Sequence, residues 1–347
     1  MKQVKIALIG MGRIGQIHFK NIQHQLPGAA ILAVADPIYD KSLKEIYNDV
    51  IFSVNPDEVI ALPQIDAILV CTPTSSHADL IEKGIKSGKH VFCEKPMDLS
   101  LQRTKALSDM AMETGVKLML GFNRRFDPDF RQAYQSVRDG KIGDIQIVKI
   151  TSRDPGPPPM DYIKNSGGLF MDMAIHDFDM ARYIMGKEVV EVFSKGLNII
   201  DKEIGAAGDI DTALTTLIFE DGTYAVIDNS RKASYGYDQR LEIFGSGGMI
   251  QLENNLHNRN VLYNQEGIHH ALPLDFFMDR YAKSYLKEME LFIDALVNDN
   301  EMPAGGVDGL KATQIAYAAK RSVESGQPVK LSEVMINSTH GVENVRS

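Results

Sequence analysis

Hydrophobic residues in the first 120 positions come in short, nearly unbroken runs. These runs lie at 4–9, 30–35, 66–71, 90–93 and 117–120. Between them lie segments with helical periodicity, such as 76–85 and 100–114, each begun by Ser or Thr and closed near a glycine. Unbroken apolar runs are typical of strands buried on both faces, as in a parallel sheet covered by helices. The pattern therefore predicts an α/β fold whose N-terminal domain is a Rossmann doubly wound parallel sheet.

After about residue 145 the pattern changes to strand-like alternation, which dominates 145–152 and 189–263. Hairpin turns are expected at 220–223 and 245–248, and helices at 168–185, 276–298 and 307–325. Consecutive strands without intervening helices predict a C-terminal α/β domain with a large, mostly antiparallel open sheet. We expect a dinucleotide-binding domain at 1–122, a substrate-binding and oligomerisation domain at 123–335, and a polar tail at 336–347.

Composition narrows the class of protein and its partners. The chain has 347 residues, of which 44% are apolar and 24% charged, as in an ordinary globular protein. The net charge of −9, without a block of like charges, makes nucleic acid and anionic membranes poor partners. No apolar run approaches the roughly 18–20 residues of a membrane span, and the N-terminus does not read as a signal peptide. The two cysteines, Cys71 and Cys93, suit free thiols, so we expect a cytoplasmic protein.

A glycine-rich motif follows the first predicted strand and opens the helix expected at 14–25. It reads Gly10-Met11-Gly12-Arg13-Ile14-Gly15. Gly10 permits a tight turn, Gly12 lets backbone N–H groups approach a pyrophosphate, and Gly15 allows close packing of helix and sheet. Asp36 ends the second strand, 21 residues beyond Gly15, where a carboxylate binds ribose hydroxyls and repels a 2′-phosphate. The motif predicts NAD rather than NADP; a purely structural glycine loop is the alternative.

Two further segments end buried strands at the carboxyl edge of the predicted sheet, where ligands bind in open α/β sheets. Cys71-Thr72-Pro73 follows one strand, and Glu94-Lys95-Pro96 follows the next. Lys95 can direct a cation at the nicotinamide end of the cofactor and hydrogen-bond a substrate oxygen. An ordinary capped loop and a solvated lysine are the alternatives.

Asp172 and His176 stand four residues apart in the helix predicted at 168–185, and therefore share one face. A dehydrogenase must remove a hydroxyl proton as hydride leaves the carbinol carbon, and histidine suits that role. A carboxylate one turn away can orient the imidazole, raise its basicity or hold a neighbouring substrate hydroxyl. The alternatives are a capped helix terminus and a metal site. Asp177 and Asp179 point away from the shared face, so no metal is expected.

Two other polar segments are candidates for substrate contact. Arg124 and Arg125 directly follow the last strand of the first domain, where they can contact substrate or cofactor, or form a salt bridge between domains. The proline-rich loop at 152–159 suits a polyol pocket or a plain connector.

Taken together, these motifs resemble the Gfo/Idh/MocA oxidoreductase family over nearly the whole chain. The segments that carry the resemblance are, in order, GMGRIG, CTPTSSH, HVFCEKP, GFNRRFDP and DMAIHDFDMARYIMG. The stretch from SRDPGPPP to YIKNSGG, and YGYDQR with FGSGGM, are similar to the branch of the family that oxidises myo-inositol at C2.

The resemblance implies catalytic roles for Lys95, Asp172 and His176, with Lys95 bridging cofactor and substrate, His176 as the base and Asp172 as its partner. It implies that NAD contacts Gly10, Met11, Gly12, Arg13, Ile14, Gly15, Asp36, Cys71, Thr72, Pro73, His77, Glu94 and Lys95. It implies that the substrate contacts Lys95, Arg125, Asp154, Asp172, His176 and Tyr235.

The expected function is NAD-dependent oxidation of a cyclic polyol, myo-inositol foremost, to its ketone, scyllo-inosose. Another inositol isomer, a sugar such as glucose, and a non-catalytic NAD-binding sensor are the alternatives. The family also implies a homo-oligomer, commonly a tetramer, joined through the open sheet.

Overall fold

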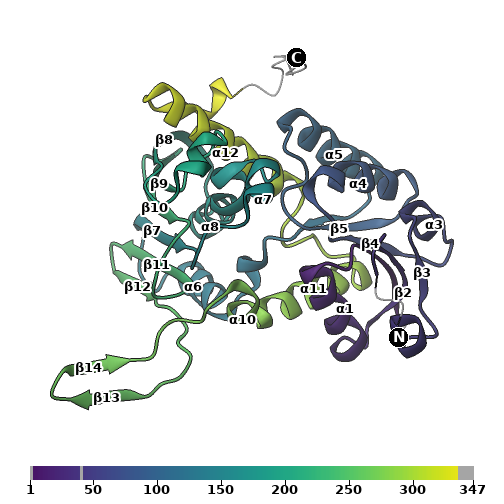
Figure 1. The fold of residues 1–347 in the computed structure, drawn as a ribbon. Helices are drawn as coiled ribbons and strands as arrows, with labels where there is room; N and C mark the ends of the chain where they lie inside the picture. The colour runs from purple at the N-terminus through teal and green to yellow at the C-terminus, as the bar shows by residue number, and fades with distance from the viewer. Residues whose placement is uncertain (1–2, 40–41, 335–347) are drawn as a thin grey trace.

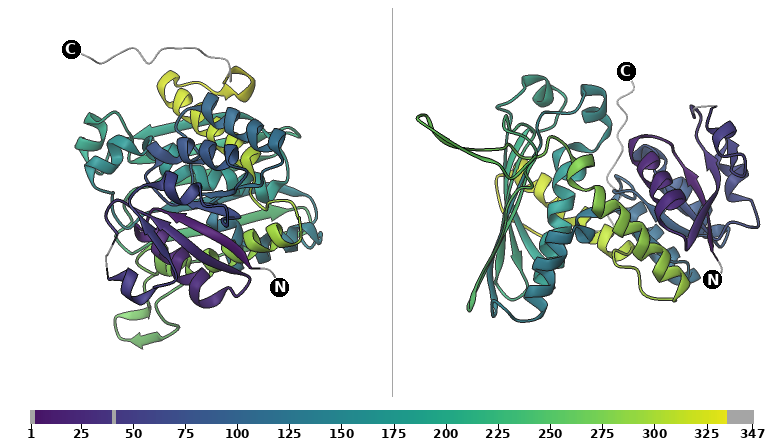
Figure 2. Two further views of the ribbon diagram at one scale, coloured as in Figure 1. Left: turned by 90° about the vertical axis from the view of Figure 1, so that its right-hand side faces the viewer. Right: turned by 90° about the horizontal axis from the view of Figure 1, so that it is seen from below.

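Two β-sheets with a layer of helices between them make up most of the structure (Figures 1 and 2). The computed structural model describes residues 3–39 and 42–334. The polar tail predicted at 336–347 lies outside these residues. No helix in the described part of the chain is long and apolar enough to cross a membrane.

The first sheet is parallel and has the strand order β3-β2-β1-β4-β5-β6. Its strands are β1 (Val4–Ile9), β2 (Ala29–Ala35), β3 (Ile51–Ser53), β4 (Ala67–Val70), β5 (His90–Cys93) and β6 (Leu118–Leu120). All five predicted strands are present, and the doubly wound fold is confirmed. The sixth, β3, was not predicted because it is only three residues long and begins with the exposed Ile51.

Helices cover this sheet, and two short turns prolong its loops. They are α1 (Arg13–Gln25), α2 (Leu43–Ile46), α3 (Pro56–Ile60), η1 (Thr74–Ser76), α4 (His77–Lys86), α5 (Leu101–Thr114) and η2 (Asn123–Phe126). The predicted capping chemistry is visible in α5, where the Ser100 side chain accepts a hydrogen bond from the Arg103 amide. Gly115 follows the last residue of the helix, as predicted.

The second sheet has seven strands in the order β12-β11-β7-β10-β9-β8-β15. They are β7 (Ile145–Arg153), β8 (Val189–Leu197), β9 (Thr212–Phe219), β10 (Tyr224–Ser230), β11 (Asp238–Gly245), β12 (Gly248–Leu252) and β15 (Val329–Lys330). Every pair is antiparallel except β7 with β10, so the sheet is mostly antiparallel, as predicted. Both predicted hairpin turns are present, joining β9 to β10 and β11 to β12. A separate hairpin, β13 (Val261–Asn264) with β14 (Gly267–His270), projects from the body (Figure 1).

The remaining helices lie mainly on the side of the second sheet that faces the first domain (Figure 2). They are α6 (Pro128–Arg138), α7 (Met160–Asn165), η3 (Phe170–Ala174), α8 (Ile175–Met185), α9 (Lys202–Ala206), α10 (Phe277–Arg280), α11 (Ala282–Val297), α12 (Gly306–Ser325) and the short η4 (Leu331–Glu333). The single helix predicted at 168–185 is in fact two elements. Its first part, η3, is a π-helical turn, and the α-helix proper begins only at Ile175.

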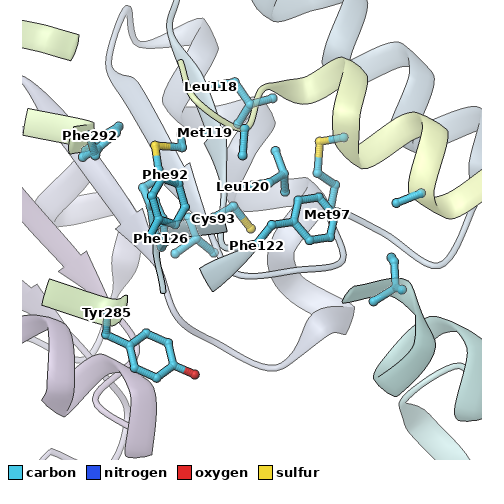
Figure 3. Close-up of a cluster of buried hydrophobic side chains, with 14 of the residues drawn as sticks. Phe92, Cys93, Met97, Leu118, Met119, Leu120, Phe122, Phe126, Tyr285 and Phe292 are labelled. Carbon is cyan, nitrogen blue, oxygen red and sulfur yellow. The ribbon is translucent and has the colours of Figure 1, made fainter. Parts of the chain in front are cut away.

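The C-terminal part of the chain returns to the first domain. Helix α11 packs against α1, and the amide of Leu120 in β6 donates to the carbonyl of Ala304. Figure 3 shows Tyr285 and Phe292 of α11 beside Phe92 of β5 in a continuous apolar core. The division of the chain at residue 122 remains a prediction; in space, α11 belongs as much to the first domain as to the second.

Two consecutive arginines tie the turn after β6 to helix α8. Arg124 pairs with Asp177 and donates to the Ser152 hydroxyl. Arg125 donates from Nε to Asp179 at 2.7 Å, and its guanidinium lies 2.9 Å from Asp308. These groups are buried apart from a partial exposure of Asp308. The salt-bridge interpretation of Arg125 is therefore the one the structure supports, and the implied contact of Arg125 with substrate is wrong.

Replacing Arg125 with Met should destabilise the fold by about 3–5 kcal/mol, because Asp179 would remain buried without its counter-charge. Denaturant unfolding measures this loss. The control is Lys149→Met, which removes an exposed ion pair with Glu242 and should cost at most about 1 kcal/mol. Equal stabilities of the two variants would contradict this assignment of Arg125.

Candidate active site at the carboxyl edge of the first sheet

The glycine motif forms a cradle with space for a phosphate group. Gly10 has φ +97°, and a Cβ there would lie 2.6 Å from the Cys71 carbonyl oxygen. A Cβ on Gly15 would lie 2.0 Å from the Gly10 carbonyl oxygen, so the loop and helix α1 touch. At Gly12 a Cβ would meet no described atom within 4 Å, and no side chain caps the first turn of α1. Open space at free helix N–H groups is what a pyrophosphate requires, so these residues fit a bound dinucleotide.

Asp36 stands beside this cradle at the end of β2. Its carboxylate accepts hydrogen bonds from the amides of Met11 at 2.6 Å and Ile38 at 2.7 Å. It thereby fixes the glycine loop against the second strand. A carboxylate at this place fits the adenosine ribose of NAD, as the sequence predicts.

The other residues expected to contact the cofactor lie at the same edge, but two of them have structural partners. The ring of His77 is buried, with its nitrogens 2.8 Å from the Pro96 carbonyl and 2.7 Å from the Thr72 carbonyl. His77 therefore joins the two loops, and its ring nitrogens are not open to a cofactor, contrary to expectation. The Glu94 carboxylate lies 3.0 Å from Nε2 of the buried His18.

Lys95 brings the first sheet into contact with the segment that carries Asp172. Its ammonium donates to the Asp172 backbone carbonyl at 2.6 Å and lies 3.5 Å from that residue's Oδ1. Both side chains are largely buried, at 16% and 13% exposure. The carbonyl is available because η3 is a π-turn, in which hydrogen bonds run from residue i to i+5 and the regular α ladder is interrupted.

Asp172 lies in the π-turn η3 and His176 in the second position of α8, and no hydrogen bond joins these two described side chains. The Asp172 carboxylate instead accepts from the Tyr162 hydroxyl at 2.8 Å and from Arg231 at 3.3 Å. Asp172 is therefore a partner of Lys95 in this structure, and its role as orienter of His176 stays a prediction.

His176 is partly buried, with its Nδ1 enclosed, and lies near two positive charges. Burial lowers the pKa of His176 well below its ordinary value, and the charges of Lys95 and Arg124 lower it further. The ring packs edge-on against Phe122, and Nδ1 has no hydrogen-bond partner among the described residues. The imidazole is thus neutral at physiological pH, which is the state that can accept a proton.

Of the remaining predicted substrate contacts, Asp154 belongs to this cluster and Tyr235 does not. Burial raises the pKa of Asp154 to about 7, the nearby charge of Asp172 raises it further, and the charge of Arg231 opposes the rise. The hydroxyl of Tyr235 donates to Asp238 at 2.6 Å and accepts from Arg153 at 3.1 Å, so it belongs to a separate network.

The structure removes two of the side chains weighed as metal ligands, because Asp177 and Asp179 are bonded to arginines. A different buried group, His18 with Glu94 and Glu288, has ligand-type atoms within 4.8 Å of one another. Burial raises the pKa of Glu288 well above its ordinary value, and the charge of Glu94 raises it further.

Sequence reasoning missed three residues of the charged cluster. Tyr162 comes from α7, Arg231 follows β10, and Asp209 pairs with Arg231 at 3.3 Å. Only Arg231 carried a usable signal, since it directly follows a predicted strand, as Lys95 does.

Comparison with known proteins identifies the family of the chain. Residues 4–122 match the oxidoreductase family with an NAD-binding Rossmann fold, and residues 130–251 match the Gfo/Idh/MocA C-terminal domain. The chain therefore belongs to the Gfo/Idh/MocA family: it is an oxidoreductase that binds NAD.

Similar proteins include inositol dehydrogenases. The chain is 45% identical to the myo-inositol 2-dehydrogenase of Thermotoga maritima, over 96% of this chain and all of that one. It is 44% identical to the inositol 2-dehydrogenase of Rhizobium meliloti, over 95% and 99% of the two chains. Among solved structures, the scyllo-inositol dehydrogenase of Lactobacillus casei with bound NAD(H) and scyllo-inositol has a TM-score of 0.88 at 32% identity, covering 95% of this chain and all of that one.

Two glycine substitutions should separate cofactor binding from folding. Gly12→Ala places a methyl group in the open space at the start of α1, and should raise the Kd for NAD about tenfold, or about 1.4 kcal/mol, with an unchanged Tm. Gly15→Ala forces α1 away from the Gly10 carbonyl, and should cost about 1–3 kcal/mol of stability. Calorimetric titration and thermal unfolding measure the two effects. Normal NAD affinity in the Gly12 variant would argue against the phosphate cradle.

Proposed function

We propose that this chain oxidises myo-inositol at C2 to the corresponding ketone, scyllo-inosose, with NAD as the oxidant. The observation that carries the proposal is that Lys95 pairs with Asp172 at the carboxyl edge of the NAD-binding sheet, beside a neutral, partly buried His176 whose pKa the Lys95 charge helps to lower. A cation, a carboxylate and a neutral imidazole at one place supply what alcohol oxidation needs.

Each residue of the cluster has one task in this proposal. NAD, when bound, accepts the hydride from the substrate carbon. The neutral His176 accepts the hydroxyl proton, and the Lys95 ammonium stabilises the negative charge that develops on the oxygen. Asp172 holds Lys95 and accepts from a neighbouring hydroxyl. Asp154, when ionised, accepts from a further hydroxyl of the ring.

The choice of isomer is part of the proposal. The relatives named above include enzymes named for myo-inositol and for scyllo-inositol. Epimers differ in the direction of a single hydroxyl, so one or two hydrogen bonds decide between them. The higher identity, 45% to the myo-inositol enzyme against 36% to a scyllo-inositol 2-dehydrogenase of Bacillus subtilis, favours myo-inositol.

We also infer that the chain forms a homo-oligomer. The family resemblance implies that this oligomer is a tetramer. The face of the second sheet opposite the buried one carries exposed apolar side chains. Phe244 is paired with Met249 on one side and with Ile147 on the other, and Ile147 is paired in turn with Tyr224. Three of these four residues are exposed, which makes a continuous apolar strip across four strands. Such a strip is more typical of an interface than of a free surface.

The substrate is tested by measuring NADH formation with myo-inositol, scyllo-inositol, chiro-inositol and glucose, each with NAD and with NADP. We expect the highest kcat/KM for myo-inositol with NAD. A higher kcat/KM for scyllo-inositol or chiro-inositol than for myo-inositol would overturn the choice of isomer. Activity with glucose alone would overturn the assignment of an inositol as substrate.

Replacing His176 with Ala should lower kcat by about 100- to 10,000-fold, because the base of the reaction is lost. NAD binding, measured by titration, should stay near that of the unmodified protein. Loss of both properties, or of neither, would contradict the role of His176.

The pH dependence should follow Asp154. Since the pKa of Asp154 is about 7, its carboxylate forms as the pH rises through that value, and kcat/KM for the polyol should rise with it. Because His176 is already neutral in this range, its titration should not change kcat/KM near pH 7. In Asp154→Asn the rise should vanish and KM should increase. A profile unchanged by this substitution would show that Asp154 does not bind substrate.

A further inference from the structure

Arg231 is among the largest fully buried side chains of the structure, and it points at the proposed active site. It directly follows β10, and its amide donates to the Asp211 carbonyl at 2.8 Å. Its guanidinium lies 3.3 Å from a carboxylate oxygen of Asp172 on one side and 3.3 Å from one of Asp209 on the other. One buried cation thus joins a residue of the site to a residue outside it.

The fold alone gives no reason for a charge at this place. Apolar side chains of similar volume often stabilise a protein as well as buried ion pairs do, because taking charges out of water is costly. In addition, Arg231 Nε has no hydrogen-bond partner among the described residues. Arg280 Nε is also without a partner in the described part of the chain, so the feature that sets Arg231 apart is its pairing with the Asp172 carboxylate, which indicates a role in the site.

Asp209 holds Arg231 and the start of the Asp172 segment at the same time. Its Oδ1 accepts from the Leu169 amide at 2.9 Å, one residue before the π-turn begins. Gly168, with φ +82°, allows this approach, since a Cβ there would lie 2.6 Å from the same Oδ1. Asp209 therefore fixes the backbone that leads into η3. Through Arg231 it also fixes the side chain of Asp172, which lies in η3.

We propose that Arg231, anchored on Asp209, is a positioning residue that holds the Asp172 carboxylate against Lys95 and Tyr162. This role rests on the proposed function, to which it adds that Arg231 sets the geometry of the Lys95–Asp172 pair. Asp172 has two oxygens: Oδ2 faces Arg231, while Oδ1 faces Tyr162 and Lys95. Without Arg231 nothing described here holds Oδ2, and the carboxylate is free to turn away from Lys95.

Arg231 also balances the charge of the cluster. Asp154, Asp172 and Asp209 bring three carboxyl groups together beside Lys95 and Arg231. Asp154 is also influenced by the more distant Arg124, which lowers its pKa, and by Asp177, which raises it. The charge of Arg231 opposes the rise in the pKa of Asp154, so removing Arg231 should move that pKa upward. Removing the negative charge of Asp209 leaves more of the Arg231 charge uncompensated. The pKa of Asp154 should then move downward.

The test compares Arg231→Met, Arg231→Lys and Asp209→Asn with Arg280→Met. Arg280 is a matched control, because it is also a buried arginine paired with an aspartate, Asp127, but has no contact with Asp172. We expect Arg231→Met to lower kcat/KM for inositol about 100-fold with unchanged NAD affinity, since a carboxylate misplaced by about 1 Å has an effect of that size. Arg231→Lys should recover part of the loss.

The pH profile and the structure of the variant separate positioning from stability. The pH midpoint of kcat/KM should move up in Arg231→Met, move down in Asp209→Asn and stay in place in Arg280→Met. Equal losses of activity and Tm in the two Met variants, with unmoved midpoints, would overturn the proposal. A crystal structure of Arg231→Met provides a test that needs no turnover. If the Asp172 carboxylate still lies against Lys95 in that structure, the positioning role is overturned. Lack of inositol oxidation by the unmodified protein would overturn only the proposed substrate.

Discussion

The pairing of two adjacent arginines with two aspartates on one helix determines where the site is built. Arg124 and Arg125 lie in the first turn beyond the parallel sheet, and Asp177 and Asp179 lie in the first turn and a half of α8. Buried guanidinium groups require partners, so α8 can pack against the end of the sheet in only one register. That register puts His176, which immediately precedes Asp177, at the carboxyl edge where an open α/β sheet binds its ligands.

Charge compensation within the site follows from the same burial. Lys95 and Arg231 approach the Asp172 carboxylate from different sides, and each comes from a different sheet. Removing any one of these charges leaves the others in an environment of low polarity. Burial and the Asp172 charge raise the pKa of Asp154 to about 7, whereas burial and the charges of Lys95 and Arg124 lower the pKa of His176, which leaves the imidazole neutral near neutral pH.

The fold and the cofactor motif could be predicted from sequence because their signals are local. Buried parallel strands are continuous apolar runs, and the glycines meet steric demands within a few residues of one another. The partners of Asp172, Arg125 and His77 could not be predicted in this way. A π-turn leaves no clear trace in hydrophobic periodicity, and the partners of Asp172 within it, Tyr162 and Arg231, come from other elements of the chain. Arg125 finds Asp179 through a tertiary contact across 54 residues, and His77 bonds to the backbone of two loops that meet only in the folded sheet.

The central claim is that these residues serve direct hydride transfer from a polyol carbon. The most direct measurement is mass spectrometry of the NADH formed from myo-inositol deuterated at C2. The account predicts that the NADH retains the deuterium and that the reaction slows with the labelled substrate. NADH formed without deuterium, with the label lost to water, would contradict hydride transfer from C2 and with it the assignment of the site.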